Sequence, residues 1–122
     1  MKITGDEKIT RDFTYVDDVV EGCLRAGCFP ELSGHTIEIG TGIETPIKRL
    51  SEIINDITGN QAEIIYEEMR SWDNVYRRCA SVEKARSLLD FSANVKLETG
   101  LKHTVEWFQR NWEQIKNSAF FT

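Results

Sequence analysis

The sequence has few cysteines and histidines, and this scarcity argues against a disulfide-rich protein or a zinc protein. Its 122 residues include three cysteines and two histidines. Cys23, Cys28 and Cys79 are odd in number and do not have the spacing of metal ligands. We therefore expect reduced, mostly buried thiols in a cytoplasmic protein. His35 and His103 lie far apart in the sequence, so we expect no metal site.

Long apolar runs and an excess of positive charge are also missing. No apolar run approaches the roughly 20 residues that span a bilayer, and the N-terminus lacks the apolar core of a signal peptide. The net charge is -5, so we expect neither a membrane nor a nucleic-acid partner. Any bound anion must be held by a local cluster of basic side chains.

The composition is otherwise that of an ordinary globular domain. Hydrophobic residues make up 40% of the chain and charged residues 29%. A chain of this length supports one hydrophobic core. We therefore predict a single domain over residues 1–122.

Residues 11–22 are the stretch around which the rest of the chain is organised. Residues 13–16 alternate aromatic and β-branched side chains, which predicts a short strand. We expect Asp17 and Asp18 to cap a helix that ends near Gly27. Apolar side chains follow at helical spacing, at Val19, Val20, Cys23 and Leu24.

Arg11 lies just before this strand-to-helix turn. A guanidinium fixed there could receive a phosphate or a carboxylate with a rigid fork of donors. The alternative is that Arg11 pairs with Asp12 or Glu21 on the surface.

The remaining elements follow from turn residues and periodicity. Residues 1–9 look like a polar lead-in, and strands are predicted over 35–39 and 62–66. Helices are predicted from Thr45, as N-cap, to residues 58–60, from Ser81, as N-cap, over a short segment, and over about 99–117. This order predicts an α/β fold with a small mixed, partly parallel sheet of about three strands and about four helices.

Each of the three later helices has an apolar stripe that predicts burial. The stripes are Ile47, Leu50, Ile53, Ile54 and Ile57; Ala85, Leu88 and Leu89; and Leu101, Val105, Phe108, Trp112 and Ile115. We interpret Trp107 and Trp112 as core or interface residues rather than as platforms for base stacking.

Basic and acidic residues follow the predicted strand at 62–66. Arg70, Asp73, Arg77 and Arg78 lie just past its end, where open α/β sheets bind ligands. An arginine could take two diphosphate oxygens, while an aspartate could accept hydrogen bonds from ribose hydroxyls. The alternative is that Arg77 and Arg78 are solvated or paired with nearby glutamates.

Two further patterns do not point to catalysis. Gly40-Thr41-Gly42 lacks the remaining residues of a dinucleotide or nucleoside-triphosphate loop, so we interpret it as a tight turn. Tyr15, Tyr66 and Tyr76 have no lysine four residues later, and such a cation is what lets a tyrosine act as an acid or base near neutral pH. These residues alone define no catalytic centre.

Four segments in register resemble the C-terminal part of an extended short-chain dehydrogenase/reductase of the nucleotide-sugar epimerase/dehydratase family. Residues 11–22 resemble its R-D-F-x-Y-V-x-D-V segment, and residues 37–42 its N-I-G-T-G strand and turn. Residues 70–85 resemble its R-x-x-D and R-R-x-A-D-x-x-K-A run, and residues 101–108 its last helix. The resemblance covers nearly the whole chain.

The resemblance implies roles for three residues. Arg11 and Arg70 would contact the diphosphate of a UDP- or dTDP-type nucleotide sugar, and Asp73 its ribose. The sequence departs from the family pattern at Ser81, where aspartate is usual, at Trp72, where a small residue is common, and in the Gly5 turn, which lacks a second glycine.

The family's G-x-x-G-x-x-G cofactor fingerprint and catalytic Tyr-x-x-x-Lys do not occur in these 122 residues. In the family's full-length enzymes these motifs bind NAD and carry the reaction. We therefore expect a truncated lobe that binds a nucleotide sugar, binds no cofactor alone and is not catalytic alone, the Rossmann domain being absent. The alternatives are a subunit of a split epimerase or dehydratase, and an oligomeric remnant that binds nothing.

Oligomerisation is a further expectation. In the intact family fold the helix after Asp17 and part of the last helix pack on the cofactor domain. Without that domain their apolar faces would be exposed, which favours a homo-oligomer or a partner chain that carries the missing half.

Overall fold

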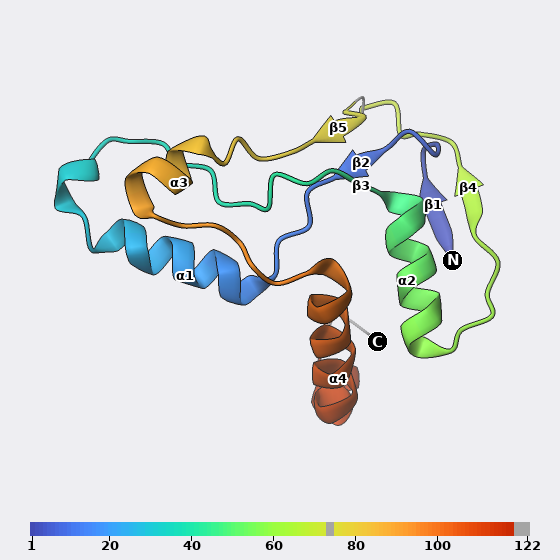
Figure 1. Ribbon diagram of the computed structural model, residues 1–122. Helices are drawn as coiled ribbons and strands as arrows, with labels where there is room; N and C mark the ends of the chain where they lie inside the picture. The colour runs from blue at the N-terminus through green and yellow to red at the C-terminus, as the bar shows by residue number, and fades with distance from the viewer. Residues whose placement is uncertain (73–74, 119–122) are drawn as a thin grey trace.

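A computed structural model describes residues 1–72 and 75–118. The described helices are α1 (Val16–Gly27), the short 3-10 helix η1 (Pro30–Leu32), α2 (Ile47–Thr58), α3 (Glu83–Leu89) and α4 (Leu97–Lys116). The molecule is elongated, with α1 and α3 at one end and α2 at the other (Figure 1). Helix α4 projects from the underside between these two ends.

The strands are short and form two small sheets. In one, β1 (Lys2–Thr4) runs parallel to β4 (Ile65–Glu67). In the other, β2 (Thr10–Arg11) lies between β3 (Thr45–Pro46), which is antiparallel to it, and β5 (Arg77–Arg78), which is parallel. The predicted α/β fold, with mixed, partly parallel pairing and four α-helices in the described ranges, is confirmed.

The positions of the strands differ from the prediction. Residues 13–16 form no strand, because pairing ends where the Asp12 amide donates to the Arg78 carbonyl, and α1 begins four residues later. Residues 35–39 form no strand either. They instead contribute Ile37 and Ile39 to packing against the core. The predicted polar lead-in over residues 1–9 contains a strand, β1.

The predicted N-caps are wrong, whereas two predicted helix ends are correct. Asp17 and Asp18 lie in the first turn of α1, where carboxylates interact favourably with the helix dipole. Thr45 belongs to β3, and Ser81 lies before Val82, which is the N-cap residue of α3. Helix α1 ends at Gly27, and α2 ends before Gly59, whose φ of 66° needs a glycine.

Asp18 has a different role from the one predicted. Its side chain is buried, and its carboxylate accepts hydrogen bonds of 3.1 Å from the backbone N–H groups of Asn94 and Val95. These bonds satisfy a charge that would otherwise be costly to bury. Asp18 thereby joins α1 to the segment that leads into α4.

The core lies between α1 and α3. Ala85, Leu89 and Phe91 are nearly inaccessible, and the partly buried Leu88 packs against them. The predicted inward face of α3 is therefore confirmed. In α2, Ile53 is fully buried and the other stripe residues are partly buried.

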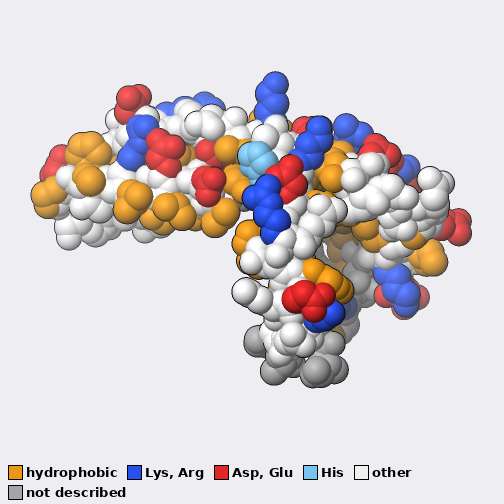
Figure 2. Space-filling model, turned by 90° about the horizontal axis from the view of Figure 1, so that it is seen from below, with side chains coloured by type: hydrophobic (Ala, Val, Ile, Leu, Met, Phe, Trp, Pro, Cys, Tyr) orange, Lys and Arg blue, Asp and Glu red, His pale blue; other side chains and the backbone are white. Residues whose placement is uncertain are grey.

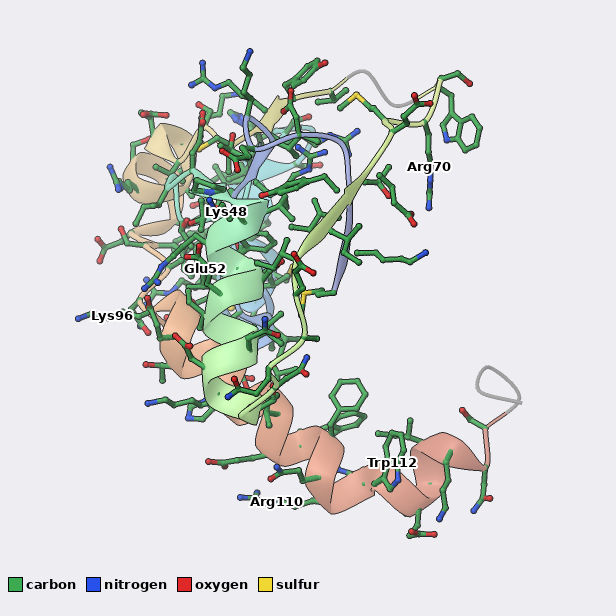
Figure 3. All side chains as sticks on the ribbon, turned by 90° about the vertical axis from the view of Figure 1, so that its right-hand side faces the viewer. Lys48, Glu52, Arg70, Lys96, Arg110 and Trp112 are labelled. Carbon is green, nitrogen blue, oxygen red and sulfur yellow. The ribbon has the colours of Figure 1, made fainter. Side chains whose placement is uncertain are left out.

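The stripe of α4 is buried only in part: Leu101, Val105 and Ile115 are partly buried, whereas Phe108 and Trp112 are exposed, contrary to the prediction. Gly100 is the buried residue of this helix, because the Tyr15 ring packs against it. Trp107 is 55% exposed and Trp112 is 51% exposed, so neither is a core residue. Trp112 lies in the part of α4 that projects away from the other elements (Figure 3).

An apolar face of α1 is also exposed. Val16, Val20 and Leu24 are each at least half exposed. Apolar side chains line the end of the molecule that contains α1 (Figure 2). The opposite face of α1 holds Asp18 and Gly22, which are its buried residues. The expectation of mostly buried thiols is wrong, since all three cysteines are exposed, two of them in or next to α1.

Truncation of the core should destabilise the chain far more than the same kind of change on the surface. We expect Leu89→Ala to lower the free energy of unfolding by about 2–5 kcal/mol, because it leaves a cavity beside Phe91. Ile43, which is 66% exposed, provides the control. Ile43→Ala should change the free energy of unfolding by about 0.5 kcal/mol or less. Urea denaturation measures both values, and equal losses would contradict the assigned core.

Candidate functional site

The Asp12 carboxylate links three segments of the chain. Its Oδ1 accepts hydrogen bonds from the backbone N–H of Thr41, at 3.1 Å, and from the Thr41 hydroxyl. Its Oδ2 accepts from the backbone N–H groups of Gly42, at 2.8 Å, and Ala80, at 3.3 Å. One side chain therefore holds the turn after residue 39 and the segment after β5 against β2.

These bonds change the acidity of Asp12. Partial burial by itself raises the pKa of the carboxyl, but the hydrogen bonds from Thr41, Gly42 and Ala80 together outweigh burial and lower the pKa below its ordinary value. Asp12 is therefore ionised at neutral pH, and its charge is matched by backbone dipoles rather than by a basic side chain.

The Gly40-Thr41-Gly42 segment bends the chain and has the positive φ that was expected of a glycine turn, and its described contacts do not suit a phosphate loop. Gly42 has a φ of 73°, which favours glycine. A Cβ atom at Gly40 would lie 2.4 Å from the Ala80 Cβ and 2.8 Å from an Asp12 carboxylate oxygen. The N–H groups of Thr41 and Gly42 donate to Asp12, so they are already occupied.

Arg11 is held by backbone carbonyl groups. One terminal nitrogen of its guanidinium donates to the carbonyls of Thr10, at 2.7 Å, and Tyr76, at 3.2 Å, and the other donates to that of Val75, at 3.1 Å. No ion pair joins Arg11 to an acid within residues 1–72 and 75–118. The alternative that Arg11 pairs with Asp12 or Glu21 is therefore wrong, and Glu21 pairs with Arg25 instead.

Arg11 lines an open groove of about 430 Å³ beside β2 and β5. The groove is lined by residues from three segments: Arg11, Asp12 and Thr14; Glu38, Ile39 and Gly40; and Arg78, Cys79 and Ala80. The Glu38 carboxylate accepts a hydrogen bond from the Ser81 backbone N–H. The pKa of the Cys79 thiol is raised, because neighbouring atoms partly desolvate this otherwise exposed group and the nearby Asp12 charge adds to the effect.

Arg77 and Arg78 differ in their contacts. Arg77 forms a bidentate pair with Glu44. The Glu44 carboxylate also accepts a hydrogen bond from the Thr10 hydroxyl. The alternative of pairing with a glutamate is thus correct for Arg77. Arg78 lines the groove together with Arg11.

The other two predicted site residues are placed less fully. Arg70 lies on the connection that follows β4, at an edge of the molecule (Figure 3), and its guanidinium lies 6.0 Å from the centre of the Trp72 ring. It is not one of the residues that line the groove around Arg11. Asp73 lies outside the described residues.

Sequence reasoning missed Asp12 as the organiser of this site. The available signal was the turn at residues 40–42, whose backbone N–H groups need an acceptor. The described residues contain no group of three or more histidine, cysteine, aspartate or glutamate side chains placed to hold a metal ion. None of the helices in the described ranges is both long and apolar enough to cross a bilayer.

The chain aligns in fold and sequence with the C-terminal part of nucleotide-sugar epimerases of the extended short-chain dehydrogenase/reductase family. It is 34% identical over 119 residues to a UDP-glucuronate 4-epimerase from Thermodesulfobacterium geofontis, covering 96% of this chain and 36% of the relative. No protein-family model matches the chain.

Two solved structures show the same likeness. An epimerase from Methanothermobacter thermautotrophicus superposes with a TM-score of 0.92 and 41% identity, over 96% of this chain and 35% of that one. The Bordetella bronchiseptica enzyme WbmF, in complex with NAD+ and UDP, superposes with a TM-score of 0.72 and 39% identity. The match covers 90% of this chain and 32% of WbmF. The chain therefore spans about a third of the length of these relatives.

Asp12→Asn tests the role of the carboxylate through its pH dependence. Because the pKa of Asp12 is lowered in the folded state, its stabilisation is present above the unfolded-state pKa and is lost as the pH falls through the folded-state pKa. We expect Asp12→Asn to cost about 1–3 kcal/mol at pH 7, because an amide replaces an oxygen that accepts N–H groups.

The difference from the wild type should begin to shrink below about pH 4, the ordinary range of an aspartate, and should disappear as the pH falls through the lowered pKa of folded Asp12. Urea denaturation at pH 7 and pH 3 measures it. Glu68→Gln, at an exposed position after β4, is the control and should have little effect at either pH. A cost that is the same at both pH values would show that ionisation of Asp12 is not what stabilises the turn.

Proposed function

We propose that residues 1–122 form the nucleotide-sugar-binding lobe of an epimerase/dehydratase-type protein and are not catalytic on their own. The observation that carries this proposal is the state of Arg11. Three backbone carbonyl groups hold its guanidinium in place, while no acidic side chain among the described residues neutralises it. A fixed cation beside an open groove is suited to an anionic ligand.

The relatives suggest which anion this is. WbmF was solved with NAD+ and UDP, and the Thermodesulfobacterium relative acts on UDP-glucuronate. We extend the nucleoside-diphosphate part to this chain, with Arg11 and Arg70 on the diphosphate and Asp73 on the ribose. NAD is not assigned to these residues, because they contain neither the dinucleotide fingerprint nor Tyr-x-x-x-Lys.

Calorimetric titration with UDP, dTDP, GDP and NAD tests the proposal. We expect saturable binding of one nucleoside diphosphate and no response to NAD. Arg70→Ala should weaken binding about tenfold or more, since a hydrogen bond to a charged group contributes about 1.5–3 kcal/mol. Binding of NAD, or of none of the nucleotides, would contradict the proposal.

A split enzyme is the second candidate, and the exposed face of α1 is the observation that favours it. Val20 and Leu24 lie on an open apolar surface with Phe29, which is 39% exposed. A partner chain that carries an NAD-binding domain would cover this surface. Recovery of epimerase or decarboxylase activity on mixing the two chains would support this candidate, and an oligomeric remnant would show neither binding nor activity.

The same surface predicts association of the chain with itself when no partner is present. We expect light scattering to detect species larger than a monomer at high concentration, since exposed apolar patches favour association. Leu24→Lys should shift the population toward monomer. Ile43→Lys should not, although Ile43 is exposed to nearly the same extent, at 66% against 67% for Leu24. A monodisperse wild-type monomer would contradict this prediction.

A further inference from the structure

We infer that Arg78 is a second cationic binding residue, which with Arg11 makes the groove a site for a doubly charged phosphate group. This inference deepens the proposed function and rests on it for the identity of the natural ligand. The nucleotide roles proposed above involve Arg11, Arg70 and Asp73, whereas Arg78 is assigned here from the pairing of β2 with β5.

The strand register places the two arginines side by side. Arg11 and Arg78 are direct partners in the parallel pair of β2 and β5. Neighbouring strands lie about 4.8 Å apart, and paired residues project from the same face of a sheet. Both residues line the same groove, as this geometry requires.

Neither guanidinium is neutralised by an acidic side chain within the described ranges. Arg11 donates to backbone carbonyls, and no hydrogen bond or ion pair joins the Arg78 side chain to another residue that the structure describes. Like charges directly opposite each other on neighbouring strands destabilise the pair. An anion bound between the arginines would remove this repulsion.

The acidic residues of the groove are already engaged. The Asp12 carboxylate accepts four hydrogen bonds, from Thr41, Gly42 and Ala80. The Glu38 carboxylate accepts one from the Ser81 backbone N–H. Neither carboxylate pairs with Arg11 or Arg78, so both guanidinium groups are left to an anionic acceptor such as a diphosphate.

Arg77 provides a matched control. It is the neighbour of Arg78 in β5 and is also exposed, but it pairs with Glu44 at 2.7 Å rather than lining the groove. An effect that required only positive charge near β5 would be the same for both arginines. An effect of the groove would be confined to Arg78.

Calorimetric titration of the full chain with inorganic pyrophosphate and with UDP tests the inference. We expect Arg78→Ala to weaken pyrophosphate binding about tenfold or more, and Arg77→Ala to leave it within about twofold. Arg78→Lys should restore part of the affinity, because it keeps the charge but loses the fork of donors. Without ligand, Arg78→Ala should unfold at no lower urea concentration than the wild type, since it removes a repulsion.

The outcomes separate this inference from the proposed function. If UDP binding depends on Arg11 and Arg70 but not on Arg78, the inference is wrong and the proposed function stands. If pyrophosphate binding depends on Arg78 while no nucleotide binds, the inference stands and the proposed function is wrong. Equal losses for Arg77→Ala and Arg78→Ala, or no pyrophosphate binding by the wild type, would overturn the inference.

Discussion

The hydrogen bonds to the Asp12 carboxylate are the constraint on which the site depends. Strands β2 and β5 are only two residues long, so the hydrogen bonds between strands alone stabilise this sheet weakly. Asp12 joins the turn at Thr41 and Gly42 and the segment at Ala80 to β2. The Asp12 carboxylate accepts hydrogen bonds only from backbone N–H groups and a hydroxyl. It therefore leaves the charge of Arg11 available to a ligand.

The two faces of this small sheet have different contacts, because successive side chains of β2 and β5 point to opposite faces. On one face the Glu44 carboxylate accepts hydrogen bonds from the Thr10 hydroxyl and the Arg77 guanidinium, so the positive charge of Arg77 is neutralised there. On the other face Arg11 and Arg78 line the groove together. The same two strands thus provide a closed structural contact on one side and a cationic surface on the other.

Periodicity and turn residues predicted the helices well, because a helix of two or more turns leaves a repeated pattern in the sequence. The ends at Gly27 and Gly59 and the inward face of α3 could be predicted in this way. The strands could not, since two-residue strands carry no period. Likewise Arg11 could be singled out from its motif, whereas the choice of Arg78 over Arg77 needs the register, which depends on segments far apart in the sequence.

The exposed faces of α1 and α4 fit a chain that aligns with about a third of its relatives' length, while the groove is formed entirely within these residues. The central claim, that this groove holds a phosphate-bearing ligand, is tested most directly by titrating a ¹⁵N-labelled chain with UDP and following amide chemical shifts. We expect saturable shifts centred on Arg11, Asp12 and residues 78–80. Saturable shifts confined to α1 or α4, or none at all, would contradict it.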